Sequence, residues 1–248
     1  MTKKLSIDNA SNQMIEKANR EDVQIVWDRL KKMMPQCGFG SLGICCTFCN
    51  MGPCSIDPFS EEKKTGVCGA SIDLIAARNL ARKVAAGSSA HSDHGRDIAE
   101  ALMEIALDKT TDFHISDEEK LKKLAAEFNI EIKNKSIMEI VRELAPLMLA
   151  EFGKYSGNLK MIDRAPDKQK KIWNKLNITP RSIDREVVEI MHRTNMGVDS
   201  DYKSVILGSF KTALADGWGG SMIGTELTDT IVGSPVPVRA KVNLGVLK

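Results

Sequence analysis

The sequence predicts an all-α domain that is interrupted near its start by one irregular, cysteine-rich loop. Apolar residues recur at helical spacing through most of the chain. All six cysteines fall within residues 36–69, where glycine is also frequent, so this stretch is a poor candidate for a core element. We therefore expect a helical domain over residues 1–234 that contains a loop over 36–69. Residues 235–248 are expected to form an extended exit into another domain.

The first predicted helix leads directly into the cysteine-rich loop. Its apolar residues fall on one face at helical spacing. Pro35 ends the pattern two residues before the first cysteine, Cys37. The residues of the apolar face are Val23, Val26, Trp27, Leu30 and Met34.

Two helices are predicted directly after the loop. Ser71 is a suitable N-cap for the first, and Gly87 is expected to end it. The second begins near Ser89 or His91. The apolar positions are Leu74, Ile75, Ala77, Leu80, Ala81 and Val84 in the first helix, and Ile98, Ala101, Leu102 and Ile105 in the second.

Two capping boxes of the form S-x-x-E predict the next two helix starts. Ser116 pairs with Glu119 in the first box, and Ser136 pairs with Glu139 in the second. Pro146 lies inside the apolar pattern that follows the second box. We expect it to kink or divide that helix.

The last third of the chain also shows helical patterns. Pro166 suits the first turn of a helix that ends at Leu176. Three further patterns cover residues 183–192, 201–215 and 221–231. The apolar face expected for the second of these consists of Val205, Ile206, Phe210, Ala213 and Leu214.

The composition excludes several classes of function. The formal net charge is +2 although 27% of the residues are charged, so neither nucleic acid nor an acidic membrane surface is an expected partner. No apolar run approaches the length that spans a bilayer. The polar N-terminus shows no secretory signal region. We expect a soluble, cytoplasmic protein.

The cysteine spacing points to iron–sulfur clusters. The spacing is C-x7-C-C-x2-C-x4-C-x13-C, and its last four members supply one complete set of thiolates for a cubane cluster. Cys37 and Cys45 are then left over. Two leftover thiolates become four in a two-fold dimer, so we expect a homodimer with a shared cluster at its seam. The last four cysteines are Cys46, Cys49, Cys54 and Cys68.

The adjacency of Cys45 and Cys46 supports this division. Successive side chains of extended backbone point to opposite sides, so adjacent cysteines suit two clusters better than one. A disulfide framework does not fit a chain without a secretory signal. A structural zinc site stays open, because four thiolates also suit zinc. Zinc ribbons usually have two C-x2-C pairs, however, and this chain has one.

Five separated motifs resemble a known family. The motifs are PQCGFGSLGICCTFCNMGPC, VCGA, AAGSSAHSDHGR, EIMHRTNMG and NLGVLK. In this order they resemble the N-terminal part of the catalytic subunit of nickel-containing carbon monoxide dehydrogenase. The resemblance implies that the last four cysteines hold an intra-subunit [4Fe-4S] cluster, the B-cluster. It implies that Cys37 and Cys45 hold half of a dimer-bridging [4Fe-4S] or [2Fe-2S] cluster, the D-cluster.

The same resemblance indicates what lies outside this sequence. The family's active site, a nickel–iron–sulfur centre called the C-cluster, takes a histidine and several cysteines from further along a longer chain. No cysteine follows Cys68 here, and the sequence stops at Lys248, where the family's first α/β domain would begin. We therefore expect residues 1–248 alone to transfer electrons and not to oxidise CO.

The resemblance also gives two histidines a candidate role. In the family, one helix can carry histidines at steps of three that are interpreted as a proton exit. Here the first two steps are His91 and His94, and the next two are the carboxylates Asp97 and Glu100. Carboxylates in general, when unperturbed, titrate about two units lower than imidazole. A proton relay through His91 and His94 is one interpretation, and ordinary polar helix residues are the other. The remaining histidines, expected to be structural, are His114 and His192.

The complete enzyme would convert CO and water reversibly into CO2, two protons and two electrons. By the resemblance, this chain would pass electrons from the nickel centre through the B-cluster to the D-cluster and on to a ferredoxin-type acceptor. The alternatives are a stand-alone iron–sulfur redox sensor or regulator, and the related hybrid cluster protein, a hydroxylamine-type reductase. The sequence leaves open whether acetyl-CoA synthase is a partner.

Overall fold

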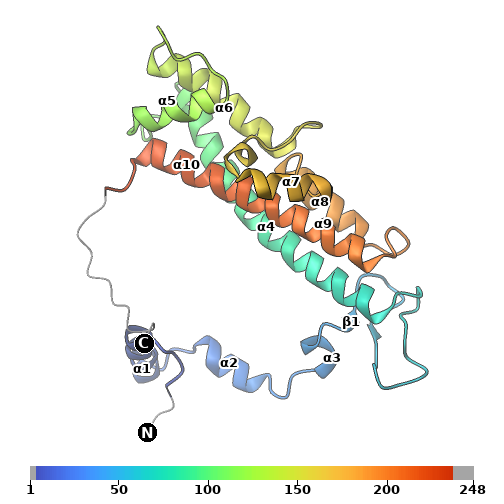
Figure 1. Ribbon diagram of the computed structural model, residues 1–248. Coiled ribbons are helices and arrows are strands. Elements are labelled where there is room, and N and C mark those ends of the chain that lie inside the picture. The colour runs from blue at the N-terminus through green and yellow to red at the C-terminus, as the bar shows by residue number, and fades with distance from the viewer. Residues whose placement is uncertain (1–3, 237–248) are drawn as a thin grey trace.

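The computed structural model describes residues 4–236, which form a helical bundle with a cysteine-rich loop at one end (Figure 1). The helix α4 runs along the whole bundle, and α6, α8, α9 and α10 pack against it. The all-α prediction is confirmed, since the β-structure of the described residues is limited to one two-stranded ribbon and one isolated bridge. The elements are α1 (Asn9–Arg20), α2 (Val26–Lys32), α3 (Gly38–Ser41), β1 (Cys45–Cys46), β2 (Cys54–Ser55), α4 (Ile72–Ala106), α5 (Glu118–Glu127), α6 (Ile137–Gly153), the 3₁₀ turn η1 (Lys160–Arg164), α7 (Asp167–Lys175), α8 (Ile183–Arg193), α9 (Tyr202–Ala215), the π-helical segment η2 (Asp216–Gly220) and α10 (Ser221–Val232).

The helix α4 continues through Gly87, where the sequence predicted an end. Ser71 caps its start as expected, because its hydroxyl accepts a hydrogen bond from the N–H of Leu74 at 3.3 Å. Ser89 does not begin a new helix; its hydroxyl donates to the backbone oxygen of Ala85 at 2.8 Å. A glycine inside a helix costs about 1 kcal/mol relative to alanine. The packing of α4 against its neighbours outweighs that cost.

The middle of α4 lies directly against η2. Gly95 on α4 faces Gly220 on η2, and a Cβ atom on Gly220 would lie only 2.9 Å from the Cα of Ser92. Glycine at both positions therefore allows the two backbones to touch. This contact brings Asp216, the first residue of η2, beside α4.

Two clusters of buried side chains hold the bundle together. The larger lies among α4, α5, α6 and α10 and includes Leu102, Leu144 and Leu227, each fully buried. The smaller lies at the start of α4, where Ile56 of the cysteine-rich loop packs in the same cluster as Ile75. The loop is therefore anchored to the bundle by apolar contact.

One of the two predicted capping boxes is confirmed. Ser136 accepts from the N–H of Glu139, and the Glu139 carboxylate accepts from the N–H of Ser136 at 2.7 Å. The other box is wrong, because α5 is capped by Asp117 instead of Ser116. The Ser116 hydroxyl donates to the backbone oxygen of Ile231 at 2.7 Å, a contact with α10 that a local pattern does not reveal.

Pro146 lies inside α6 without dividing it. Proline removes one backbone hydrogen bond and costs a helix interior about 3 kcal/mol. The adjoining face of α6 carries Leu144, Ala145 and Met148, all fully buried. Burial of this face outweighs the cost, since each large apolar side chain contributes about 2 kcal/mol when buried.

The helices α7 to α10 lie within one or two residues of the predicted ranges, but the buried face of α9 differs from the predicted one. Phe210 is 55% exposed. Small and polar residues face the bundle instead, because they let α9 approach its neighbours closely; Gly208, for example, lies against Ile190 and Arg193 of α8. The buried residues of α9 are Val205, Gly208, Ser209, Thr212 and Ala215.

The segment that precedes the cysteine-rich loop stands away from the bundle (Figure 1). The sequence did not predict α1, which Asp8 caps by accepting from the N–H of Ser11 at 2.6 Å. The helix α2 is shorter than the predicted helix before Pro35, and neither α1 nor α2 buries a residue. The large apolar side chains exposed in this segment and just after it include Val23, Val26, Trp27, Leu30, Met33, Met34 and Leu42.

Two further expectations concern membranes and the tail. Over the part of the chain that the structure describes, no helix is long and apolar enough to cross a membrane. The extended exit expected over residues 235–248 lies, from residue 237 onward, outside the described residues.

Candidate metal centre

Three of the four predicted ligands of the intra-subunit cluster lie on one short hairpin. The antiparallel strands β1 and β2 place Cys46 directly opposite Cys54. The turn between them contains Cys49, whose backbone oxygen accepts from the N–H of Gly52 at 3.2 Å. A Cβ atom on Gly52 would lie 3.1 Å from the backbone oxygen of Cys46, so a side chain at this position would crowd the turn.

The fourth predicted ligand, Cys68, lies in the turn that leads into α4. This turn is closed by a hydrogen bond from the N–H of Gly66 to the oxygen of Ala70 at 2.9 Å. The N–H of Val67 donates to the Sγ of Cys54 at 3.5 Å. The turn over residues 65–71 therefore packs against the hairpin.

Cys37 and Cys45 occupy a different position from the other four. Cys37 is exposed at the start of α3, and Cys45 is half-buried in β1. Cys45 and Cys46 are neighbours in a strand, so their side chains point to opposite faces of the ribbon. The Sγ of Cys45 lies 3.8 Å from the hydroxyl of Ser55 on β2.

All six thiols are free, and no disulfide links them. Among residues 4–236, no three side chains of cysteine, histidine, aspartate or glutamate lie close enough to hold a single metal ion. The thiols are instead distributed over α3, the hairpin and the turn 65–71.

The first turns of α4 support the hairpin from behind. The side-chain amide of Asn79 donates to the backbone oxygens of Gly43 and Cys45 at 2.8 and 2.9 Å. The guanidinium of Arg82 lies 4.1 Å from the centre of the Phe48 ring in the hairpin turn, a cation–π contact. These contacts fix the hairpin relative to α4.

The EIMHRTNMG motif contributes contacts to α4, while its histidine, His192, is exposed. Thr194 Oγ1 accepts from Arg82 Nε at 3.1 Å, and Asn195 Oδ1 accepts from the same guanidinium at 3.2 Å. The backbone oxygen of Asn195 also accepts from Arg78 at 3.4 Å. Sequence reasoning missed both arginines, because Arg78 and Asn195 are 117 residues apart.

The two candidate relay residues lie on α4 beside η2 and α10. Nδ1 of His91 is 2.8 Å from Oδ1 of Asp216. His91 and His94 together line a hollow of about 340 Å³ between α4 and α10. Asp97 and Glu100, the next two steps of the predicted ladder, are exposed. Sequence reasoning missed Asp216, which is 125 residues from His91.

A wider hollow of about 760 Å³ lies between α4 and α8, and His94 borders this one too. Arg96 donates to both carboxylate oxygens of Asp184, at 2.9 and 2.7 Å. The Ser92 hydroxyl donates to the same carboxylate at 2.8 Å. His94 therefore lines both hollows.

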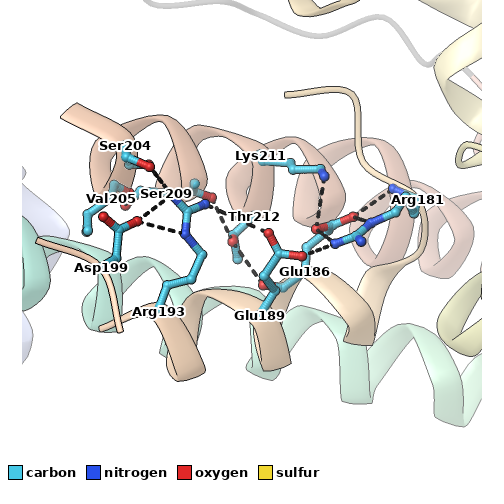
Figure 2. A network of polar contacts seen from close by, with 11 residues as sticks. Arg181, Glu186, Glu189, Arg193, Asp199, Ser204, Val205, Ser209, Lys211 and Thr212 are labelled. Atoms are coloured by element: carbon cyan, nitrogen blue, oxygen red, sulfur yellow. Dashed lines mark hydrogen bonds and ion pairs between the residues drawn. The ribbon is translucent and has the colours of Figure 1, made fainter. Parts of the chain in front are cut away.

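A network of charged side chains joins α8 to α9 and to the segment before α8 (Figure 2). The side chain of Glu186 is 1% exposed, accepts two hydrogen bonds from the Arg181 guanidinium at 2.9 Å and lies 3.5 Å from Nζ of Lys211. At the other end, Arg193 donates to the Asp199 carboxylate at 2.8 Å. The network fixes the C-terminal end of α8 and the loop that follows it.

Two carboxyl groups of this network have a lowered pKa, because ion pairing lowers it by more than burial raises it. Burial alone would raise the pKa of Glu189, but the hydrogen bond and charge of Arg181 lower it below its ordinary value. Burial would likewise raise the pKa of Asp199, but the hydrogen bond from Arg193 lowers it. Both carboxylates are therefore ionised at neutral pH.

Comparison with models of protein families matches residues 44–248 to the prismane/CO dehydrogenase family. The matched range includes every cysteine except Cys37. The chain belongs to this family. Together with the relatives described next, this match confirms the resemblance to carbon monoxide dehydrogenase that the sequence motifs showed.

Individual members of the family agree with this assignment. The chain is 50% identical over 242 residues to carbon monoxide dehydrogenase 1 of Methanosarcina mazei. This alignment covers 98% of this chain and 38% of the relative. It superimposes with a TM-score of 0.90 and 48% identity on a nickel-free carbon monoxide dehydrogenase from Thermococcus sp. AM4, covering 99% of this chain and 39% of that one. A structure of acetyl-CoA synthase/carbon monoxide dehydrogenase, described with NiZn[Fe4S4] and NiNi[Fe4S4] clusters, gives a TM-score of 0.88 and 33% identity, covering 94% of this chain and 35% of that one. The chain thus spans less than two fifths of these relatives, at their N-terminal end.

Proposed function

We propose that this chain is the electron-transfer portion of a nickel carbon monoxide dehydrogenase, the enzyme that interconverts CO and water with CO2, two protons and two electrons. The observation that carries the proposal is the set of four cysteines on the hairpin and the turn 65–71. The relatives named above are carbon monoxide dehydrogenases or contain one. This favours the dehydrogenase over a hybrid cluster protein and over a stand-alone redox sensor.

Cys46, Cys49, Cys54 and Cys68 would hold the intra-subunit [4Fe-4S] cluster. Hydrogen bonds from backbone N–H groups to sulfur are among the features that set the potential of such a cluster, and the N–H of Val67 already points at the Sγ of Cys54. The loop has one C-x2-C pair, whereas zinc ribbons usually have two. The bound cluster would supply one-electron transfer.

Cys37 and Cys45 would hold one half of a [4Fe-4S] or [2Fe-2S] cluster shared by two copies of the chain. The exposure of Cys37 leaves it accessible to a second copy. The segment that carries it exposes a run of large apolar side chains, including Met33 at 69% and Leu42 at 71%. Exposed apolar surface of this kind is typical of an interface, which supports a homodimer with the shared cluster at its centre.

The helical domain over residues 1–234 would therefore carry the electron path, and residues 235–248 would lead into an α/β domain. The ligands of the nickel centre would come from that further part of the protein. Electrons would leave through the shared cluster to a ferredoxin-type acceptor. Acetyl-CoA synthase is a candidate partner, because one similar structure contains both enzymes.

His91 and His94 would relay protons away from the nickel centre. If Nδ1 of His91 donates to the Asp216 carboxylate, Nε2 is the nitrogen that remains free to accept and release a proton. A carboxylate in this position also fixes the orientation of the imidazole ring. His94 lines both hollows beside α4 and would be the next residue of the relay after His91.

The central experiment is a count of clusters in the anaerobically purified protein. Two intra-subunit [4Fe-4S] clusters and one shared cluster require about 12 iron atoms per dimer if the shared cluster is [4Fe-4S], or about 10 if it is [2Fe-2S], in addition to those of the nickel centre. A Cys46→Ser variant should lose the intra-subunit signal in electron paramagnetic resonance, and a Cys37→Ser variant should lose the shared one. Tightly bound zinc in place of iron at these cysteines would refute the proposal. An unchanged spectrum in the Cys37 variant would refute the shared cluster.

A further inference from the structure

Arg78 is a buried cation without a counter-charge. Its side chain is on α4, and the residue is 3% exposed. Its guanidinium donates to the backbone oxygens of Asn195 and Asp199, and its Nε has no partner. No carboxylate among residues 4–236 forms an ion pair with it. Buried charges are normally paired, because an unpaired charge loses its hydration without compensation. A buried guanidinium with these neutral partners is therefore suited to face an anion.

The surroundings of Arg78 indicate where that anion lies. Arg78 borders a cavity of about 290 Å³ together with Cys68, Gly69 and Gly197. Cys68 is one of the four proposed cluster ligands. Arg78 thus shares this cavity with one of the four cysteines that would hold the cluster.

Arg82, one helical turn further along α4, is half-buried and likewise has no carboxylate partner among the described residues. It faces the hairpin through its contact with Phe48. Its hydrogen-bond acceptors, Thr194 and Asn195, are neutral. Within the described residues it forms no ion pair with a carboxylate. Two positive charges therefore lie behind the cysteine-rich loop with only neutral groups to hold them.

Asp199, two residues after the EIMHRTNMG motif, has a carboxylate that already pairs with another arginine. Asp199 offers its backbone oxygen to Arg78 at 3.1 Å, whereas its carboxylate accepts from Arg193 at 2.8 Å (Figure 2). The loop after α8 thus binds the arginines through carbonyl, hydroxyl and amide oxygens and directs its own negative charge elsewhere. The physical role of the EIMHRTNMG motif is therefore to hold the two arginines, a role in which its exposed histidine takes no part.

We propose that Arg78, assisted by Arg82, is the counter-charge of the cluster held by Cys46, Cys49, Cys54 and Cys68, and that it raises the midpoint potential of that cluster. The inference rests on the proposed function. Four thiolates outweigh the positive charge of the oxidised iron–sulfur core, so the site is a net anion and becomes more negative by one charge when it accepts an electron. A fixed cation stabilises the reduced form more than the oxidised form. The electron comes from the preceding centre and leaves to the shared cluster, and the guanidinium stays protonated throughout.

The test is a redox titration of the holoenzyme followed by electron paramagnetic resonance. Arg78→Met removes the charge, and Arg78→Lys retains it. Arg142→Met makes the same change in net charge at an exposed ion pair between Arg142 of α6 and Asp108, which follows α4. We expect Arg78→Met to lower the midpoint potential by at least 59 mV, which corresponds to a tenfold change in the equilibrium constant of a one-electron couple. Arg78→Lys should recover most of that shift, and Arg142→Met should leave the potential unchanged.

The iron content and the cluster spectrum distinguish a failure of the proposed role of Arg78 from a failure of the proposed function. A full intra-subunit signal in Arg78→Met with the potential of the parent protein would overturn the role of Arg78 and leave the cluster assignment intact. An equal lowering of the midpoint potential in Arg78→Met and in the control Arg142→Met would also overturn it. If Arg78→Met fails to assemble, Arg82→Met at a half-buried position provides the same measurement, with a smaller shift in the same direction expected. No such cluster signal in the parent protein would refute the proposed function itself.

Discussion

The carboxylate of Asp216 lies 2.8 Å from Nδ1 of His91, although the two residues are 125 positions apart in the chain. The contact depends on the close approach of α4 and η2 at Gly95 and Gly220. A π-helical segment therefore supplies the partner of the imidazole. Such segments often occur at functional sites.

The first prediction concerns this pair. Asp216→Asn should slow CO oxidation by the holoenzyme about 100-fold, at the lower end of what a positioned proton-transfer group contributes. The midpoint potentials of the clusters should not change, because the pair lies outside the cysteine-rich loop. His114→Asn, at an exposed histidine, is the matched control and should retain the parent rate. A parent rate in Asp216→Asn across the pH range would contradict the relay.

The second prediction concerns the dimer. Replacing both Cys37 and Cys45 by serine should remove the shared cluster and weaken association, because a metal site contributes its binding energy to whatever it holds together. Analytical ultracentrifugation at decreasing concentration should show dissociation of the double variant before that of the parent. The intra-subunit signal should survive. A dimer of unchanged stability would mean that the apolar segment alone forms the interface.

The third prediction concerns the buried ion pair of Glu186 and Arg181. Glu186→Ala leaves the guanidinium without its main partner and should reduce the free energy of unfolding by about 3–5 kcal/mol. Glu143→Ala, which breaks an exposed pair with Lys135, should cost no more than about 1 kcal/mol. Urea denaturation of both variants under the same anaerobic conditions measures the difference. Equal losses in the two variants would contradict this account of Figure 2.

The fourth prediction concerns acid stability. The pKa of Asp199 lies below its ordinary value of 3.8, since the hydrogen bond from Arg193 outweighs burial, which would raise it. A lowered pKa in the folded state adds stability that is fully present above the ordinary pKa and is lost as the pH falls through the folded-state pKa. The free energy of unfolding should therefore fall below about pH 4. In Arg193→Met this fall should be smaller, while stability at pH 7 is lower. A pH series of urea denaturations tests both expectations.

The fifth prediction concerns the isolated chain. No thiolate follows Cys68, and imidazole and carboxylate groups do not replace thiolate ligation of a nickel–iron–sulfur centre. Residues 1–248 alone should therefore accept and release electrons without reducing a viologen dye in the presence of CO. Activity should appear when the further part of the family's chain is supplied. CO oxidation by the isolated chain would place the catalytic centre within residues 37–68.

The sequence predicted most helices of the bundle because local patterns determine them. The capping box at Ser136 and the N-cap at Ser71 are contacts within three residues. Gly87 was interpreted wrongly, because the contacts that continue α4 come from distant helices. The buried face of α9 was wrong for the same reason, since Thr212 is buried by packing and not by hydrophobicity.

The residues of the candidate site also differ in whether local sequence reveals them. The six cysteines could be found from the sequence, because a cluster loop gathers its ligands within a short stretch. Asp216, Arg78 and Arg82 could not, because each has its partner more than a hundred residues away. The grouping of the cysteines into two clusters stays a prediction.

The continuity of α4 through Gly87 has a mechanical consequence. A single unbroken helix with a rise of about 1.5 Å per residue separates Arg78 from His91 by about 20 Å along its axis. Two helices joined by a hinge would allow this separation to change, whereas one continuous helix keeps it fixed. One inserted residue between these positions would turn everything beyond it by about 100°. The helix therefore acts as a rigid spacer that sets both the distance and the angle between the proposed paths of the electron and the proton.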